Sequence, residues 1–229
     1  MQAIFLSGGF GTRLQSMVKD VPKPMADING NPFLYYLVNF YKKQDVVKFI
    51  LSIGYKADII REYFKSYESM LFCEEKEPLG TGGAIRNILL NNSFQEDFYV
   101  VINGDTFVDI SLEDLKLFHY NNNNDISLAL VKMVNFDRYG SVELKDNRIV
   151  YFNEKKYCKS GYINAGVYIL NKNIFNNIDL PIKFSFEDFL ASNLNKLKIG
   201  GKVFEDSYFI DIGIPSDYQK AIKDFKDLF

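Results

Sequence analysis

Three glycines and an arginine are concentrated near the start of the chain, in the run SGGFGTRL at residues 7–14. Glycine carries no Cβ, so the backbone N–H groups of Gly8, Gly9 and Gly11 are open to a ligand. Arg13 adds a guanidinium whose forked shape matches phosphate oxygens. These residue types predict a phosphate-binding loop, although the glycines alone would fit a tight turn with a surface arginine equally well.

A second cation follows in the tetrapeptide PKPM at residues 22–25. The prolines on either side of Lys23 fix their own φ angles and hold the residues before them in an extended conformation. Lys23 is thereby placed close to a backbone with few side chains. Two cations beside a glycine-rich loop favour phosphate binding over an ordinary turn.

The spacing of these residues differs from that of two familiar phosphate loops. A dinucleotide-binding fingerprint that starts at Gly9 requires a third glycine at position 14, where the chain has Leu14. A Walker A motif that starts at Gly8 requires a Gly-Lys pair at positions 13 and 14. We therefore expect another type of nucleotide-binding loop.

The elements that position this loop follow from the hydrophobic pattern. Short apolar runs rich in β-branched and aromatic residues predict strands, and amphipathic stretches predict helices. The expected strands are residues 2–6, 48–53 and 98–102, and the expected helices are residues 32–43, 57–67, 82–92, 111–120 and 216–228. Ligands of open α/β sheets bind at the carboxyl ends of strands, and residues 7–14 directly follow the first strand.

Two helix starts carry the spacing of a capping box, Ser111 with Asp114 and Ser185 with Asp188. From about residue 126 strand-like runs follow one another with little helix between them, which predicts added strands and hairpins. The expected fold class is α/β, in a single Rossmann-like, doubly wound domain. We expect a mixed, mostly parallel sheet with helices on both faces and extra strands or hairpins in the second half.

Composition and charge limit the classes of partner. A net charge of -2 gives no reason to expect a nucleic acid or an anionic membrane. No stretch approaches the roughly 18 apolar residues of a membrane span, and the start lacks a secretory signal, so we expect a cytoplasmic protein. The two cysteines, Cys73 and Cys158, lie in no CxxC motif, and with a single histidine they provide neither a disulfide framework nor a zinc cluster.

The loop and PKPM together resemble the N-terminal signature of sugar-1-phosphate nucleotidylyltransferases, which make NDP-sugars from an NTP and a sugar 1-phosphate. Further matches follow in the family's order: EPLGTGGAI (77–85), NGD (103–105), RYGSV (138–142), FNEK (152–155), NAGVY (164–168), SFED (185–188) and YFIDIGIPSDYQKA (208–221). The resemblance implies one nucleotidyltransferase domain over residues 1–229. Its nucleotide-binding part would cover about residues 1–125 and its sugar-phosphate-binding part about residues 126–229.

The resemblance also implies the reaction, in which a sugar-phosphate oxygen attacks the α-phosphorus of the nucleotide and pyrophosphate leaves in line. Arg13 would hold the β- and γ-phosphates, and Lys23 would bridge the α-phosphate and the sugar phosphate. We expect these two residues to be catalytic, because the reaction needs charge stabilisation more than acid and base groups. The expected nucleotide-binding residues are Leu6, Gly8, Gly9, Gly11, Thr12, Glu77, Gly80, Thr81 and Gly82.

Two aspartates are expected to hold a magnesium ion. Asp105 follows the apolar strand at 98–102 and a glycine, and Asp211 follows the short apolar run YFI. Mg²⁺ takes one or two protein carboxylates and fills its other positions with water and phosphate oxygens. Taken alone, each aspartate would read as a turn or loop residue, and it is the resemblance that favours Mg²⁺ as cofactor.

The resemblance places the sugar 1-phosphate in the second half of the chain. Lys155 would be the second cation for its phosphate. The remaining expected sugar-phosphate-binding residues are Asn103, Gly140, Glu154, Asn164 and Glu187. Glu187 also has an explanation without a ligand, because an acid in the first turn of a helix favours the helix dipole.

The nucleobase is expected to be guanine, which makes GTP the expected NTP. Guanine offers two adjacent donors that one carboxylate accepts together, and Glu77 stands where family members recognise the base, although it would also fit a solvated strand end. Within the family, PKPMADINGNPF, EPLGTGGAI and IDIGIPSDY most resemble the D-glycero-D-manno-heptose 1-phosphate guanylyltransferases of bacterial surface-polysaccharide synthesis. An enzyme that uses UTP or GTP with mannose, glucose or N-acetylmuramate 1-phosphate is the alternative.

Two other classes of function are less well supported by the residues. A sugar-nucleotide-binding regulator without turnover would usually lack one of the charged residues, whereas Arg13, Lys23, Asp105 and Asp211 are all present. A nucleotide-dependent glycosyltransferase would typically carry a DxD motif, and NGDTFVD has none. Tyr and Phe together make up 16% of the chain and could form a subunit interface as readily as a core. The sequence is therefore compatible with a homo-oligomer as well as with a monomer.

Overall fold

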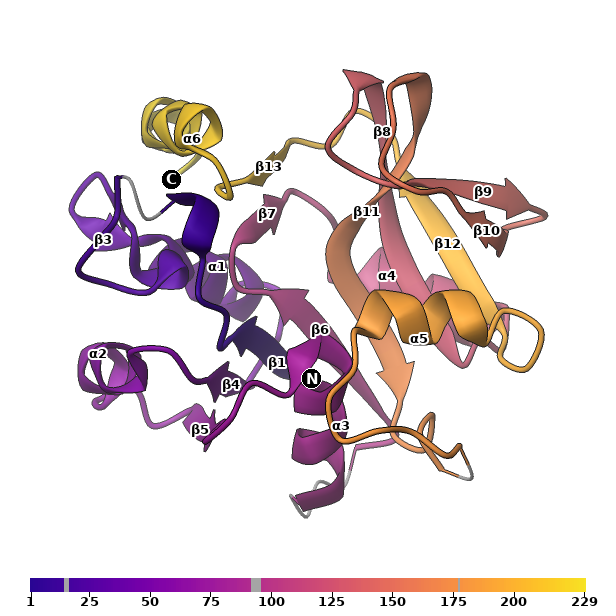
Figure 1. The fold of residues 1–229 in the computed structure, drawn as a ribbon, viewed down its shortest axis with the longest axis horizontal. Helices are drawn as coiled ribbons and strands as arrows, with labels where there is room; N and C mark the ends of the chain where they lie inside the picture. Colours follow the sequence, from indigo (N-terminus) through magenta and orange to yellow (C-terminus); the bar gives the residue numbers. More distant parts are fainter. Residues whose placement is uncertain (15–16, 92–95, 177) are drawn as a thin grey trace.

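The structure is a computed structural model that describes residues 1–14, 17–91, 96–176 and 178–229. At its centre lies a nine-stranded sheet with the strand order β5-β4-β1-β6-β11-β8-β12-β10-β9 (Figure 1). The strands are β1 (Gln2–Ser7), β4 (Lys48–Ile53), β5 (Met70–Glu74), β6 (Phe98–Asn103), β8 (Ile126–Phe136), β9 (Ser141–Lys145), β10 (Arg148–Phe152), β11 (Cys158–Asn171) and β12 (Ile199–Phe204). The three strands expected from the sequence are confirmed to within one residue.

The first half of this sheet is parallel. Strand β1 pairs in parallel with both β4 and β6, and β4 pairs in parallel with β5. Within β1, Ala3 and Phe5 pack in one core cluster and Ile4 packs in the other. Because both faces of these strands are covered, successive positions in their central parts are apolar, which explains the hydrophobic runs.

The expectation of a mostly parallel sheet is wrong for the second half. Strand β11 is antiparallel to β6, β8 and β9, and β9 is antiparallel to β10, while β12 alone joins β8 in parallel. The turn between β9 and β10 consists of Asp146 and Asn147, with φ angles of 50° and 63°. Such a two-residue turn closes an antiparallel hairpin, whereas parallel pairing needs a long crossover.

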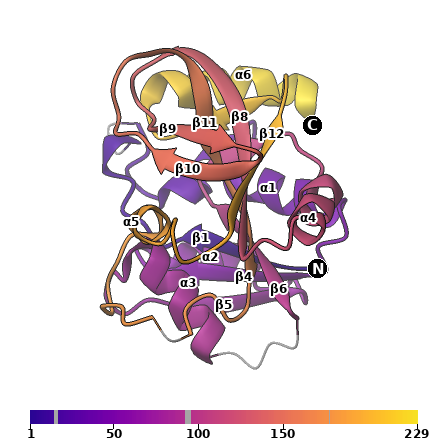
Figure 2. The same cartoon turned by 90° about the vertical axis from the view of Figure 1, so that its right-hand side faces the viewer.

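Six helices in the described part of the chain flank the sheet: α1 (Phe33–Lys42), α2 (Ala57–Phe64), α3 (Gly80–Asn91), α4 (Leu112–Asn121), α5 (Phe186–Ser192) and α6 (Pro215–Leu228). Apolar side chains of α1, α2, α4 and α6 pack in one core cluster, and those of α3 and α5 pack in the other. In Figure 1, α3 and α5 lie in front of the sheet, and α1 and α4 lie behind it. The view of Figure 2 shows the same layers from the side.

Both serines of the predicted capping-box pairs are N-caps. The backbone N–H of Asp114 donates to Oγ of Ser111 at 3.1 Å, and the N–H of Asp188 donates to Oγ of Ser185 at 3.2 Å. Each serine satisfies a backbone donor that the first turn leaves without a partner. The expected helix at 82–92 begins two residues earlier, and its last expected residue lies outside the described ranges.

Short elements complete the fold beside the carboxyl ends of β1 and β6. Two 3₁₀ turns, η1 (Thr12–Leu14) and η2 (Lys23–Met25), follow the glycine loop. Strand β2 (Asp27–Ile28) pairs with β3 (Asn31–Pro32), and β7 (Thr106–Val108) pairs with β13 (Phe209–Asp211). The pairing of β13 with β7 brings Asp211 close to the end of β6, where Asp105 lies.

Across the ranges that the structure describes, every helix is too short or too polar to traverse a lipid bilayer.

Candidate active site

The glycine loop follows directly from β1, and its glycines have different roles. Gly11 has a φ of +58°, and a Cβ there would lie 2.7 Å from Cβ of Lys23. A Cβ at Gly8 would lie 2.7 Å from Oε1 of Glu75. A Cβ at Gly9 would meet nothing within 4 Å. Backbone conformation and packing therefore favour glycine at position 11, and a Cβ at position 8 would displace the carboxylate of Glu75. At Gly9 the missing side chain leaves open space for a ligand.

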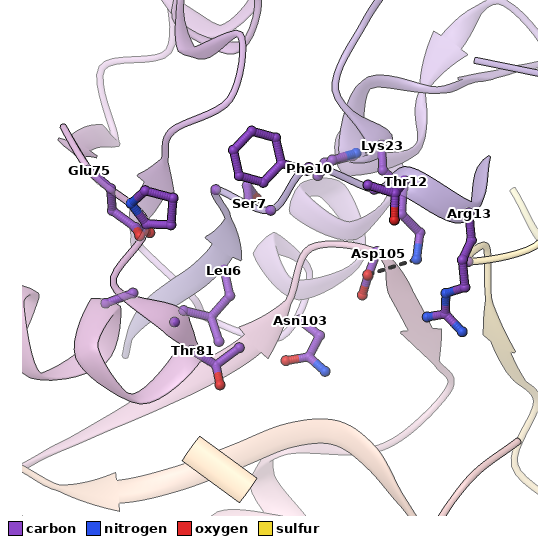
Figure 3. Close-up of a pocket in the computed structure, with 18 residues that line it drawn as sticks. Leu6, Ser7, Phe10, Thr12, Arg13, Lys23, Glu75, Thr81, Asn103 and Asp105 are labelled. Carbon is purple, nitrogen blue, oxygen red and sulfur yellow. Dashed lines mark hydrogen bonds and ion pairs between the residues drawn. The ribbon is translucent and has the colours of Figure 1, made fainter. Parts of the chain in front are cut away.

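Lys23 joins the two aspartates that were expected to hold a metal ion. Its side chain is only 7% exposed, and its Nζ donates to Oδ2 of Asp105 at 2.8 Å and to Oδ1 of Asp211 at 3.0 Å. The backbone N–H of Gly213 also donates to Oδ1 of Asp211, at 2.7 Å. Figure 3 shows the contact between Lys23 and Asp105 as a dashed line. Two carboxylates that are far apart in the sequence thus converge on one point.

This pair of carboxylates fits the donor set of a divalent metal ion. Both are hard oxygen donors, and a single cation already contacts both of them. No group of three or more His, Cys, Asp or Glu side chains suited to a metal occurs among the described residues. The protein would therefore supply two ligands and leave the other positions to water and to phosphate oxygens.

A cavity of about 390 Å³ lies over the glycine loop at the ends of β1 and β6. Both expected catalytic residues line it, as does the metal candidate Asp105. Seven of the nine expected nucleotide-binding residues line it as well: Leu6, Gly8, Gly9, Gly11, Thr12, Gly80 and Thr81. Figure 3 shows Arg13, Lys23 and Asp105 at one end of this cavity and Glu75 and Thr81 at the other.

Glu77 does not line this cavity. Its side chain is exposed, and Glu75, two residues earlier, lies on the wall in its place. Oε1 of Glu75 accepts a hydrogen bond from Ser52 at 2.8 Å, and Oε2 accepts one from the N–H of Leu79 at 3.0 Å. Residues 74–77 are all charged. The sequence therefore does not indicate which of them faces the cavity.

Gly82 is also absent from the cavity wall. It is buried in the first turn of α3, where a Cβ would lie 2.2 Å from the ring of Phe184. Its lack of a side chain is therefore needed for packing between α3 and the segment before α5. Gly80 has a φ of +72° and is likewise held against the backbone of Phe184.

A second cavity of about 600 Å³ adjoins the first. All six residues expected to bind the sugar phosphate line it: Asn103, Gly140, Glu154, Lys155, Asn164 and Glu187. Asp211 lines it too, and Arg13, Asn103 and Asp105 line both cavities. Arg13 and Asp105 thus lie at the junction of the two cavities, and Lys23 links Asp211 to Asp105 there.

The charged groups of the second cavity differ in how firmly they are held. Glu154 and Lys155 are exposed and have no hydrogen-bond or ion-pair partner among the residues that the structure describes. The amide of Asn164 is engaged at both ends, because Nδ2 donates to the hydroxyl of Tyr168 at 2.7 Å and Oδ1 accepts from the N–H of Gly166 at 3.0 Å. Burial, together with the charge of nearby Asp211, raises the pKa of Tyr139 to about 12, so its phenol remains a donor.

Sequence reasoning missed several residues of this region. Ser7, at the end of β1, is 1% exposed and lines the first cavity, and its hydroxyl has no hydrogen-bond partner among the described residues. Arg138 and Tyr139 line the second cavity, and Nη2 of Arg138 contacts Oδ2 of Asp217 at the start of α6 at 2.5 Å. Arg138 and Tyr139 belong to the RYGSV motif, so the motif carried a signal for them beside Gly140.

The comparisons with known proteins agree with this arrangement. The family profile described as "Nucleotidyl transferase" matches residues 2–227. The chain belongs to the nucleotidyl transferase family. The resemblance seen in the sequence motifs is thereby confirmed, and the α/β fold is the nucleotidyltransferase fold.

Relatives of this nucleotidyl transferase extend along the whole chain. It is 50% identical to a protein of Campylobacter jejuni named D-glycero-alpha-D-manno-heptose 1-phosphate guanylyltransferase, over 95% of this chain and 97% of the relative. It is 46% identical to a protein of the same name from Aneurinibacillus thermoaerophilus, over 99% of both chains. The crystal structure of HddC from Yersinia pseudotuberculosis complexed with GMP-PN is 39% identical, with a TM-score of 0.84 over 98% of this chain and 99% of HddC.

Proposed function

We propose that this chain transfers a guanylyl group from GTP to D-glycero-α-D-manno-heptose 1-phosphate, which yields the GDP-heptose and pyrophosphate. The observation that carries the proposal is the meeting of two cavities at Arg13, Asn103 and Asp105, with Lys23 beside them. The reaction joins two phosphorylated substrates, so it requires two adjoining sites with cations between them. The two relatives named as heptose guanylyltransferases, at 50% and 46% identity, support this choice of substrates.

Arg13 and Lys23 would stabilise charge during the transfer. Arg13 is exposed at the junction and has no hydrogen-bond or ion-pair partner among the described residues, so its guanidinium is available to the departing pyrophosphate. Lys23 lies deeper, where its ammonium would contact the α-phosphate. Because both substrates are polyanions, positioning and charge compensation account for most of the catalysis.

Asp105 and Asp211 would hold the metal ion, which we propose to be Mg²⁺. When bound, such an ion supplies positive charge to the phosphate oxygens of the substrates. The pairing of β7 with β13 keeps the two carboxylates together, and the N–H of Gly213 orients the carboxylate of Asp211. Magnesium suits a site in which the protein provides only two carboxylates.

Glu75, and not Glu77, would recognise the guanine base. It lies at the end of the first cavity opposite the cations, so a nucleotide whose phosphates reach Arg13 would direct its base toward Glu75 (Figure 3). The bonds from Ser52 and Leu79 hold the carboxylate in place. Each carboxylate oxygen has further acceptor capacity for guanine N1–H and the 2-amino group.

The two halves of the chain would bind different substrates, with the division near residue 125. Except for Gly213, every residue of the first cavity comes from positions 6–105. The second cavity is lined mostly by positions 138–211, which include Lys155 as the proposed phosphate-binding cation. Glu154 and Glu187 would accept hydrogen bonds from sugar hydroxyls.

A substrate panel tests the proposal. Purified protein is incubated with each of four NTPs and with the 1-phosphates of heptose, mannose, glucose and N-acetylmuramate, and pyrophosphate release is measured. We expect the highest kcat/KM for GTP with the heptose 1-phosphate and loss of activity with EDTA. A clear preference for another NTP or another sugar 1-phosphate would assign different substrates to the same type of reaction. If no pair of substrates released pyrophosphate, the result would contradict enzymatic function.

A further inference from the structure

The side chain of Thr81 connects the two cavities. Thr81 lines the first cavity, but its hydroxyl donates a hydrogen bond to Oε2 of Glu187 at 3.1 Å. Glu187 belongs to α5 and lines the second cavity. In Figure 3 the hydroxyl of Thr81 points away from Leu6 and Glu75, which lie on the nucleotide side. The family motif therefore places on the nucleotide helix α3 a hydroxyl that serves the other cavity.

The starts of α3 and α5 are fastened together around this contact. The hydroxyl of Thr81 also accepts a hydrogen bond from the N–H of Phe186 at 2.8 Å. The N–H groups of Gly82 and Gly83 both donate to the carbonyl of Phe184, at 3.1 and 3.3 Å. These bonds fix the distance between the two helix starts. Thr81 consequently meets Glu187 in a defined geometry, although the two residues are 106 positions apart.

Glu187 depends on such contacts for its orientation. Its side chain is exposed, and an exposed glutamate samples several rotamers in the absence of partners. Two hydroxyls, those of Thr81 and Ser185, donate to Oε2 at 3.1 Å each. Oε1 accepts no hydrogen bond from any described residue. The arrangement holds one oxygen and leaves the other to a ligand.

We propose that Thr81 is a positioning residue for the sugar 1-phosphate and acts through Glu187, although it lies on the nucleotide-binding helix. This inference rests on the proposed function, because it takes the second cavity as the sugar site. A carboxylate that is already oriented loses less conformational entropy when the sugar binds. The identity of residue 81 therefore sets the affinity for the sugar and not the affinity for GTP.

The test compares the KM for the sugar 1-phosphate with the KM for GTP in variants of Thr81. Thr81→Val keeps the branched shape and removes the hydroxyl, and Thr81→Ser keeps the hydroxyl. For Thr81→Val we expect the KM for the sugar 1-phosphate to rise roughly three- to tenfold, the scale of one immobilised side chain, while the KM for GTP changes by less than about twofold. Thr81→Ser should restore the wild-type value. An equal rise in both KM values, or no rise in either, overturns the proposal.

A double-mutant cycle with Glu187→Ala shows whether Thr81 acts through Glu187. We expect Thr81→Val to raise the sugar KM further by less than about twofold when Glu187 is already alanine, because coupled residues are not additive. A full additional rise in that background contradicts the proposal. If Thr81→Val does not fold, Thr81→Ala replaces it, since the space left by the smaller side chain admits water to the N–H of Phe186.

The sugar 1-phosphate in these assays is whichever one the wild-type protein converts. Absence of any wild-type turnover contradicts the proposed function. An active wild type whose Thr81→Val variant loses affinity for GTP contradicts only the role of Thr81.

Discussion

The side-chain ammonium of Lys23 lies 2.8 Å from Oδ2 of Asp105, although the two residues are 82 positions apart. The same ammonium lies 3.0 Å from Oδ1 of Asp211. One lysine thus compensates the charge of both carboxylates that we assign to the metal. Before its ammonium reaches a phosphate, Lys23 must exchange at least part of this contact.

Replacing Lys23 by methionine should affect metal affinity and turnover in opposite directions. Loss of the ammonium leaves two carboxylates without a counter-charge, so we expect Mn²⁺ alone to bind the variant about tenfold more tightly than wild type. Turnover should fall by roughly 100- to 1000-fold, because a preorganised cation is lost. Titration followed by electron paramagnetic resonance measures the first quantity, and pyrophosphate release measures the second.

Lys155→Met is the matched control for metal binding, because no contact joins Lys155 to either aspartate. Its affinity for Mn²⁺ should equal that of wild type. Equal Mn²⁺ affinity of Lys23→Met and wild type would show that the ammonium does not compete with the ion.

Arg13→Ala should reduce kcat by roughly 100- to 1000-fold without a change in thermal stability. The guanidinium is exposed and has no hydrogen-bond or ion-pair partner in the described part of the chain, so its removal breaks no contact of the folded state. Arg61→Ala is the control, since Arg61 pairs with Asp58 and Glu74 at the surface and lines neither cavity. Retention of more than half of the wild-type turnover by Arg13→Ala would exclude its assigned role.

Glu75→Gln should weaken the preference for GTP over UTP. An amide offers guanine one acceptor in place of two, and hydrogen bonds to a charged group contribute about 1.5–3 kcal/mol, or roughly 10- to 100-fold in kcat/KM. Glu77→Gln, two residues later and exposed, should leave the preference unchanged. The ratio of kcat/KM for GTP to that for UTP, measured by steady-state kinetics, tests this prediction. A loss of preference in Glu77→Gln but not in Glu75→Gln would assign base recognition to Glu77.

His119 should make stability depend on pH. Its side chain is 2% exposed between Ser127 and Asn171, each 3.0 Å from a ring nitrogen, and burial lowers its pKa below the ordinary value of 6.5. The unfolded chain therefore takes up a proton at a higher pH than the folded chain. This contribution to the free energy of unfolding is complete above about pH 6.5. It is lost progressively as the pH falls from there through the lower pKa of the folded state.

Urea denaturation at about pH 7.5 and about pH 5.5 measures this effect. Wild type should lose stability on acidification, and His119→Gln should lose less, because glutamine does not titrate. An identical loss in both proteins would assign the pH dependence to carboxylates instead.

Local signals in the sequence determined the parts of this protein that depend on near neighbours. The parallel strands at 2–6, 48–53 and 98–102 followed from their apolar runs, and Ser111 and Ser185 marked helix starts because a cap involves residues only three positions apart. The phosphate-binding loop and the cation of Lys23 could likewise be predicted from the sequence, because the prediction depends only on residue type and short spacing.

Tertiary structure alone decided which distant residues meet and which way their side chains point. Asp211 reaches Asp105 because β13 pairs with β7, and Thr81 turns to Glu187 because α3 is fastened to α5. Glu75 faces the cavity while Glu77 faces solvent, a choice that rests on bonds from Ser52 and Leu79. Such contacts depend on packing between residues that are far apart in the sequence, so no short stretch of the sequence predicts them.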